Sequence, residues 1–357
     1  MPHPARSHAE FRESIRGQQA TLPNFYTLFP DWKPDLHPEY GRAREEFLNP
    51  WIERWVPNPK TARKFQKAEF GVFAAAMCAR ASFEKLCTMS KAFAWYFIWD
   101  DLFDCGTLAS NNEAAAAYRE KSMQYFRAAL CNQEPFPNLS DYSIELQNAL
   151  HCWDEVAAHL RQECSREALE VLLEQKLFYL SSVDTVDVLF RGDQVPSLTE
   201  YWRRREQTAG VYPVIATIPF IYGLSVSRQD IEMNFMQLLW RHTSYLVHII
   251  NDMFSLRKEI ADNQIENIVT VIMLNRGMTC TQAMQLSHQF AQEAARGFVD
   301  VESRLKAIAV SPQRKLVEAF IEGCRNVVMG LTYWSYSGQR YFRQSEVNEC
   351  NEVDFCI

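Results

Sequence analysis

The sequence predicts an all-α fold, and three observations lead to this prediction. Apolar residues recur at helical spacing from about residue 38 onward. No run of alternating apolar and polar residues is long enough to predict a strand. The chain has only 12 glycines among 357 residues, which is few for a turn-rich β fold. Because 47% of the residues are hydrophobic, the helices can enclose a sizeable core.

The helical patterns follow one another along the chain with short interruptions. Large apolar side chains recur at helical spacing in residues 60–104, and residues 112–131 are alanine-rich. Two prolines and an asparagine in CNQEPFPNLSD then predict a loop. Ser227 and Asp230 have the spacing of a capping box and predict a helix start. The remaining helical patterns occupy residues 142–163, 166–187, 198–209, 211–224, 230–262, 280–308 and 312–338.

No linker divides the helical region, and no internal repeat is found, so the sequence predicts a single domain. Residues 1–35 are rich in proline, histidine and charge, and we expect this N-terminal segment to be partly ordered. The α-helical domain is expected over residues 36–345. Residues 346–357 are expected to form a C-terminal tail.

Composition and charge exclude several classes of partner. The net charge of −7 leaves no general basic surface for nucleic acid. The longest apolar run, residues 70–79, is too short to span a membrane, and no signal-peptide pattern precedes it. The ten cysteines form no C-x-x-C pair, which favours buried free thiols over a zinc site or disulfides. We therefore expect a cytoplasmic protein, either a monomer or a homodimer.

The string FIWDDLFDCG places Asp100, Asp101 and Asp104 at the end of a strongly apolar helical pattern. Asp100 and Asp104 share a helix face because they are four residues apart. Neighbouring carboxylates repel each other unless a cation lies between them, and Mg²⁺ commonly takes one or two carboxylates together with substrate phosphates. Taken alone, this string is equally compatible with a solvated, acidic helix end.

The string HIINDMFSLRKEI places Asn251, Ser255 and Glu259 at four-residue intervals. This spacing drifts by only about 40° per step around a helix, so the three side chains lie along one stripe. An amide, a hydroxyl and a carboxylate in that arrangement form half of an oxygen cage for a divalent cation. The alternative is the polar face of an amphipathic helix, but the apolar segment SYLVHII before the motif indicates burial.

With both motifs present, the chain resembles the class I terpene synthases, in particular the single-domain sesquiterpene cyclases of fungi. That family pairs a DDxxD motif with N-D-x-x-S-x-x-x-E, and this chain has WDDLFD and NDMFSLRKE. Arg205 in YWRRREQTAG stands where the family has an arginine before the second motif. In WSYSGQRY, Arg340 and Tyr341 match the family's Arg-Tyr pair, with Trp334 upstream.

The resemblance implies a helical bundle around a central active-site cavity and a terpene cyclase, a carbon–oxygen lyase of isoprenoid biosynthesis. It implies Mg²⁺-dependent ionisation of farnesyl diphosphate, the expected substrate, and cyclisation to a sesquiterpene hydrocarbon or alcohol with release of diphosphate. Three Mg²⁺ ions are expected, and Mn²⁺ is expected to substitute. The alternatives are a diterpene synthase using geranylgeranyl diphosphate, a chain-elongating prenyl transferase, and a non-catalytic helical protein that binds a metal or a prenyl lipid.

Residue roles follow from the same resemblance. Asp100 is expected to bind metal with Asp101 and Asp104 in support, facing Asn251, Ser255 and Glu259 on the opposite wall. The expected diphosphate-binding side chains are those of Arg205, Lys258, Arg340 and Tyr341.

The resemblance to class I terpene synthases also bears on three positions outside the proposed metal and diphosphate sites. Thr208 and Ala209 match positions at a helix break before Gly210. Leu331 stands where the family often has an asparagine.

Aromatic side chains near the two motifs are candidates for contact with a carbocation, because ring faces attract cations. Phe97 lies one helical turn before Asp100, and Trp334 precedes Arg340. Phe73 and Tyr201 are weaker candidates, and simple core packing is the alternative for each ring. His248 is expected to be a hydrogen-bonded core histidine.

Overall fold

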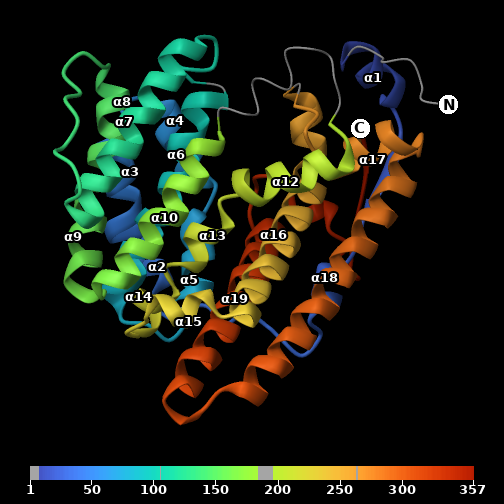
Figure 1. Ribbon diagram of the computed structural model, residues 1–357. Helices are drawn as coiled ribbons and strands as arrows, with labels where there is room; N and C mark the ends of the chain where they lie inside the picture. The colour runs from blue at the N-terminus through green and yellow to red at the C-terminus, as the bar shows by residue number, and fades with distance from the viewer. Residues whose placement is uncertain (1–7, 105, 184–195, 263) are drawn as a thin grey trace.

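The computed structural model describes residues 8–104, 106–183, 196–262 and 264–357, and these residues are mostly helical (Figure 1). This confirms the predicted all-α class. In chain order the helical elements are α1 (His8–Ile15), η1 (Phe25–Leu28), α2 (Tyr40–Arg42), η2 (Ala43–Leu48), α3 (Asn49–Trp55), α4 (Pro59–Lys67), α5 (Phe70–Met77), α6 (Phe83–Asp104), α7 (Asn112–Cys131), α8 (Ile144–His151), α9 (Asp154–Glu163), α10 (Arg166–Ser182), α12 (Leu198–Thr208), α13 (Val211–Ile215), α14 (Ile218–Tyr222), α15 (Arg228–Glu232), α16 (Asn234–Ala261), α17 (Ile268–Arg276), α18 (Cys280–Ile308), α19 (Ser311–Ser337) and η3 (Gln344–Glu346).

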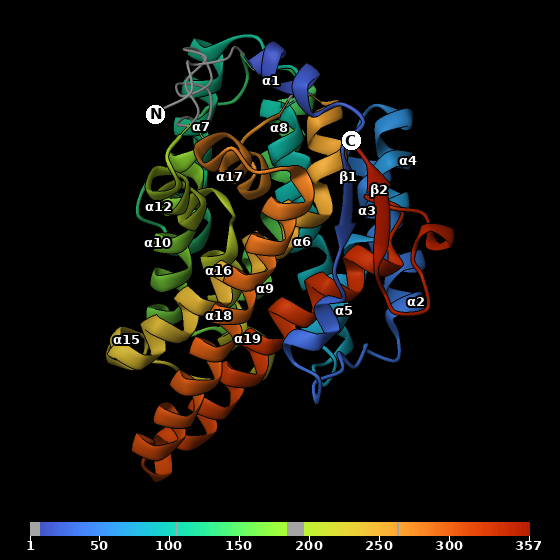
Figure 2. The ribbon, with the colours of Figure 1, turned by 90° about the vertical axis from the view of Figure 1, so that its right-hand side faces the viewer.

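Two short strands correct the expectation of a fold without strands. β1 (Gln19–Leu22) pairs antiparallel with β2 (Val353–Cys356), so a segment early in the chain lies beside the C-terminal strand (Figure 2). Each strand has only four residues, which is too short for a two-residue period to stand out in the sequence. Leu22 and Val353, which are paired in register, are both buried. The described residues of the N-terminal segment and the tail thus form part of the fold.

Several predicted helices are divided in the structure. The pattern at 142–163 forms α8 and α9, and the pattern at 211–224 forms α13 and α14. Pro219 lies in the first turn of α14, where its missing N–H costs least, and this favours a new helix start. The capping box of Ser227 and Asp230 is confirmed and begins the short helix α15. The end of the predicted helix 166–187 lies outside the described residues.

The long helices surround the centre of the bundle. α16 packs against both α18 and α19, and α19 also packs against α5 (Figures 1 and 2). α5 packs against α6, whereas α10 contacts α7, α12 and α13. In the described part of the chain, no helix combines the length and the apolar character that crossing a membrane requires. The cysteines that the structure describes are free thiols, most of them buried, as expected.

Candidate active site

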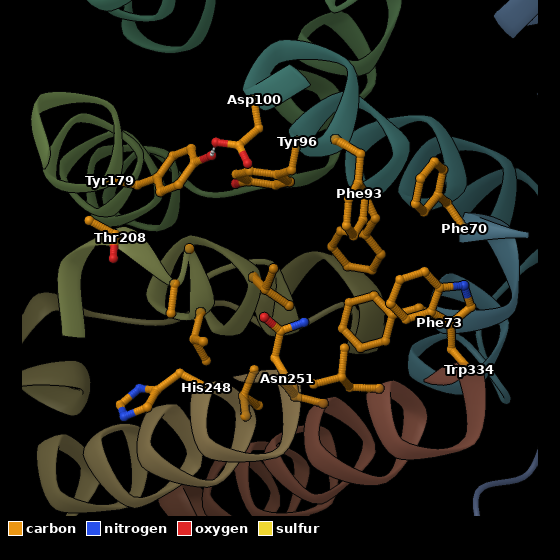
Figure 3. Close-up of a pocket in the computed structure, with 18 of the residues that line it drawn as sticks. Phe70, Phe73, Phe93, Tyr96, Asp100, Tyr179, Thr208, His248, Asn251 and Trp334 are labelled. Atoms are coloured by element: carbon orange, nitrogen blue, oxygen red, sulfur yellow. Dashed lines mark hydrogen bonds between the residues drawn. The ribbon is translucent and has the colours of Figure 1, made fainter. Parts of the chain in front are cut away.

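A cavity of about 170 Å³ lies between α5, α6, α10, α12, α13, α16 and α19 (Figure 3). Most of its wall is aromatic or aliphatic, with a few polar side chains. The lining residues are Phe70, Phe73, Phe93, Tyr96, Phe97, Asp100, Tyr179, Arg205, Thr208, Ala209, Gly210, Val211, Val214, Val247, His248, Asn251, Val327, Leu331 and Trp334.

The helix α6 supplies one wall of the cavity. Phe93, Tyr96, Phe97 and Asp100 all line it, because steps of three and four residues place side chains on one helix face. The Asp100 carboxylate accepts a hydrogen bond from the Tyr179 hydroxyl of α10 at 3.2 Å (Figure 3). The polar group of this wall is thereby oriented by a neighbouring helix.

The other two aspartates of the motif have different surroundings. Asp101 does not line the cavity, and its carboxylate pairs with the Lys64 Nζ at 2.9 Å. The Asp104 side chain lies outside what the structure describes. Of this motif, the structure therefore places Asp100 in the cavity wall.

The helix α16 supplies the facing wall, where Asn251 lies opposite Asp100 (Figure 3). The Asn251 Nδ2 donates to the Tyr341 hydroxyl at 3.0 Å, and its Oδ1 accepts from the Arg205 Nη2 at 3.3 Å. Asn251 thus links Arg205 and Tyr341, which lie far apart in the sequence. One residue of each oxygen-rich motif, Asp100 and Asn251, therefore faces the same cavity.

Ser255 and Glu259 continue along α16 beyond the cavity lining. The Glu259 Oε2 accepts a hydrogen bond from the Asn267 Nδ2 at 2.9 Å. Burial and the negative charge of Asp252 raise the pKa of Glu259 to about 7, although Asn267, Arg205 and Ser255 oppose this shift. A cation bound beside Glu259 would favour its charged form. This acidic, oxygen-rich set therefore fits a divalent metal.

Asp252, like Tyr179 and Tyr96, belongs to this site but was not predicted from the sequence. Its side chain is fully buried, and its Oδ1 accepts from the Arg205 Nη2 at 2.5 Å. Its Oδ2 accepts from the Tyr201 hydroxyl at 2.6 Å and from the Ile268 N–H at 2.7 Å. A charged residue within an apolar, buried helix pattern requires such partners, and this signal was available in the sequence. Tyr201 is held by Asp252 and does not line the cavity.

Arg340 and Tyr341 lie beside the aromatic part of the cavity. The Arg340 guanidinium lies 5.1 Å from the ring centroid of Phe97 and 5.8 Å from that of Phe70. The Arg340 Nε is buried and has no hydrogen-bond partner among the described residues. A buried, unpaired cationic donor at this position is suited to an anionic ligand.

Lys258 has a different orientation from the other proposed cations. Its Nζ pairs with the Asp262 carboxylate at 2.8 Å, four residues further along the chain, and does not line the cavity. Sequence spacing placed Lys258 beside Glu259, but adjacent residues on a helix point in different directions. Lys258 nevertheless lies near enough to Arg340 for the charge of that arginine to act on its pKa, so the two cations belong to the same region.

The predicted aromatic residues Phe97 and Trp334 line the cavity, as does Phe73. Phe97 stacks on Phe70 with a centroid separation of 4.0 Å and lies 5.5 Å from Trp334. The Trp334 Nε1 donates to the Ala68 carbonyl at 2.7 Å, which fixes the indole in the wall.

The predicted helix break is present at the cavity. α12 ends at Thr208, and Gly210 follows with φ of 65° before α13 begins. This left-handed conformation favours glycine. Thr208, Ala209 and Gly210 all line the cavity, as does Leu331.

His248 corrects a prediction. The sequence suggested a hydrogen-bonded core histidine, and the side chain is indeed fully buried. However, neither ring nitrogen has a hydrogen-bond partner among the described residues. The rings of Trp202 and Tyr245 pack around it at 5.3 and 5.6 Å. Burial, and then the nearby charge of Arg205, lower the pKa of His248 well below its usual value, which favours the neutral imidazole.

Comparison with known proteins identifies a family whose members are described as metal-binding. The sequence model of a family described as "Terpene synthase family 2, C-terminal metal binding" matches residues 91–296. The matched region is more than half of the chain and includes both oxygen-rich motifs.

Two curated fungal proteins are similar over almost the full length of the chain. "Terpene cyclase braA" of Annulohypoxylon truncatum is 25% identical over 351 residues, covering 94% of this chain and 90% of that protein. "Sesquiterpene cyclase hepA" of Aspergillus oryzae is 24% identical over 347 residues, covering 95% and 92%. Among solved structures, a-eudesmol synthase shares the fold with a TM-score of 0.73 at 17% identity, covering 86% of this chain and 97% of that one.

Proposed function

The chain belongs to terpene synthase family 2, and from this premise we propose that it is a sesquiterpene synthase that ionises farnesyl diphosphate with the aid of Mg²⁺. Membership makes it a lyase-type enzyme acting on a prenyl diphosphate. The C15 substrate is our proposal, and the similarity to a protein named as a sesquiterpene cyclase supports it. A diterpene synthase acting on geranylgeranyl diphosphate is the second candidate.

One observation carries the proposal: the carboxylate of Asp100 and the amide of Asn251 face each other across a largely aromatic cavity. Arg205 lines the same cavity, and Tyr341 is hydrogen-bonded to Asn251. The oxygens that we propose as metal ligands and the proposed cationic donors therefore lie beside an apolar chamber. A prenyl diphosphate has the matching halves, an anionic head and a long apolar chain.

Three Mg²⁺ ions are proposed to bind between the two motifs. Asp100, supported by Asp101 and Asp104, would hold them from α6, and Asn251, Ser255 and Glu259 would hold them from α16. Bound Mg²⁺ supplies Lewis acid chemistry that neutralises the diphosphate leaving group.

The proposed diphosphate donors add hydrogen bonds to the same oxygens. Arg205 and Arg340 present planar forks that match phosphate geometry, and Tyr341 offers a hydroxyl. Lys258 is proposed on resemblance alone, because its ammonium contacts Asp262. These donors favour departure of the diphosphate by stabilising the negative charge that develops on it.

The apolar wall is proposed to protect and stabilise the allylic cation. Water would quench such a cation, so the chamber must exclude it during the reaction. The ring faces of Phe97, Trp334 and Phe73 offer negative potential to a passing positive charge. The contour of the wall then determines which ring closures occur.

Purified protein incubated with C10, C15 and C20 prenyl diphosphates and Mg²⁺ tests the proposal directly. We expect cyclic C15 products and diphosphate release from farnesyl diphosphate. Preference for the C20 substrate would overturn the sesquiterpene assignment and leave a diterpene synthase. A longer diphosphate formed when isopentenyl diphosphate is added would indicate a prenyl transferase.

Replacing Phe97 with Leu is expected to change the product mixture. Leucine retains much of the apolar burial but has no ring quadrupole, so early-quenched acyclic or monocyclic terpenes should increase. Diphosphate release should persist, since the metal ligands are unchanged. Gas chromatography of the products measures the change.

A matched variant separates this effect from core packing. Phe298 is fully buried and lies outside the cavity lining, so Phe298→Leu should lower the melting temperature and leave the product ratio unchanged. Phe97→Leu is a cleaner test than Trp334→Leu, which would also remove the hydrogen bond to Ala68. An unchanged product mixture in Phe97→Leu would show that the Phe97 ring only packs the core and does not stabilise the cation.

A further inference from the structure

Lys176 on α10 is a fully buried lysine whose surroundings are aromatic. Its Nζ has no hydrogen-bond partner among the described residues. Four rings surround the nitrogen, and the distances from Nζ to their centroids range from 3.9 to 4.6 Å. The rings of this cage are those of Trp95, Tyr96, Phe126 and Trp153.

The cage stabilises positive charge at a position where burial opposes it. Burial lowers the pKa of Lys176, whereas four ring faces directed at one nitrogen favour the ammonium form. A buried charge commonly costs more than an apolar side chain of similar volume. An apolar side chain would fill this position at lower cost, so packing alone does not explain why it is a lysine. We therefore look for a function of its charge.

Lys176 is connected to the cavity through Tyr96. This ring belongs to the cage and also lines the cavity, whereas the other three cage rings do not line it. Three residues after Lys176, on the same face of α10, Tyr179 also lines the cavity and donates to Asp100. The cage therefore lies directly behind the part of the wall that carries Asp100.

Arg340 and Lys176 differ in what compensates their charge. Arg340 lies over Phe97 and Phe70, and in the proposed reaction a diphosphate neutralises it. Lys176 has no carboxylate in contact within the described parts of the chain, and burial lowers its pKa well below the usual value. In the ammonium form that the aromatic cage favours, its charge is not neutralised when the substrate is bound, in surroundings where charges are weakly screened.

We propose that Lys176 is a specificity-determining residue whose ammonium, held behind the Tyr96 ring, repels a carbocation from that wall of the cavity. The cation is thereby directed toward Phe73, Phe93 and Trp334, whose rings have no cation over their faces among the described residues. Cation intermediates that place their charge near Tyr96 are disfavoured, and the ring closures that follow from them become minor. This inference rests on the proposed cyclisation of a prenyl cation.

Lys176→Met tests the inference, because methionine has a similar length, no charge and a flexible side chain that fits an aromatic box. The variant should fold and melt at the wild-type temperature or above it, since an apolar replacement of a buried charge is often neutral or stabilising. Diphosphate release should continue. We expect the ratio of the main product to the next product to change roughly tenfold, as removal of one nearby like charge would allow.

Two further variants sharpen the test. Leu173→Met, one turn earlier on α10 and buried outside both the cage and the cavity, should keep the wild-type product ratio. If Lys176→Met does not fold, Lys176→Leu provides the same neutral test, with the same expected shift.

The outcomes separate this inference from the proposed function. A folded neutral variant with the wild-type product ratio would overturn the role of Lys176. Absence of any product from the wild-type protein with farnesyl diphosphate and Mg²⁺ would instead contradict the proposed function. A lower melting temperature with an unchanged ratio would make the cage a purely structural feature.

Discussion

Removing divalent metal with EDTA is expected to abolish product formation, and adding Mg²⁺ is expected to restore it. Asp100 and Asn251 face each other in one cavity, and Glu259 is a buried carboxylate whose pKa is raised by burial and by the charge of Asp252. Without metal, only the cationic side chains of the protein would stabilise the negative charge that develops on the diphosphate. Gas chromatography and a diphosphate assay on the same samples measure the effect. Full activity in a metal-stripped preparation would contradict the metal-dependent mechanism.

Asp100→Asn and Glu259→Gln should each lower turnover by roughly 10²–10³-fold, by analogy with loss of one preorganised electrostatic contact. Asp300→Asn, an exposed carboxylate of α18, is the control and should keep the wild-type rate. Asp100→Asn retains a group that can accept the Tyr179 hydrogen bond, so the wall should remain folded. A near-normal rate in either site variant would remove that residue from the metal site.

The stability of metal-stripped protein provides an independent measurement on Glu259. Because burial raises its folded pKa to about 7, the folded state holds this proton more tightly than the unfolded state does. Stability of the metal-stripped wild type should therefore fall as pH rises from about 4.5 to about 7. Glu259→Gln carries no charge and should lack this contribution, which urea unfolding at several pH values can detect.

The sequence was sufficient to predict the helical class and most helix positions, because apolar periodicity reflects burial on one face. It missed β1 and β2, since four-residue strands carry little periodic signal and their pairing joins segments more than 300 residues apart in the chain. It also merged α13 with α14, because apolar residues continue through the division at Thr217. Local patterns do not show where a helix stops inside a continuous apolar stretch.

The candidate site was predictable where residues of one motif share a helix face, as with Asn251 in α16. Contacts between distant segments were not, and the Tyr179 hydroxyl on Asp100 is an example. Lys258 shows the converse, because its position beside Glu259 in the sequence did not reveal that it pairs with Asp262. No sequence motif marks Lys176, and only the folded chain brings four rings around it.

Arg205→Ala is expected to lower both turnover and stability, because this arginine has two kinds of partner. It lines the cavity and is also paired with the fully buried Asp252 at 2.5 Å. Removing one member of a buried ion pair commonly costs about 3–5 kcal/mol of folding free energy, since the other charge remains buried. The Tyr201 hydroxyl and the Ile268 N–H still donate to Asp252, so we expect the lower end of this range.

Arg205→Lys separates the two roles, and this variant decides whether Arg205 acts on the diphosphate. Lysine retains a positive charge for Asp252 but lacks the planar fork that can bind Asp252, Asn251 and a phosphate oxygen together. The free energy of unfolding in urea should therefore stay close to the wild-type value, whereas turnover should fall roughly 10²-fold or more. Asp252→Asn is the matched change in the ion-pair partner of Arg205. Because Asp252 lies outside the cavity lining, this substitution should act mainly on stability. If Arg205→Lys instead kept wild-type turnover while Asp252→Asn lost it, Arg205 would serve only to neutralise Asp252, and another cation would have to bind the diphosphate.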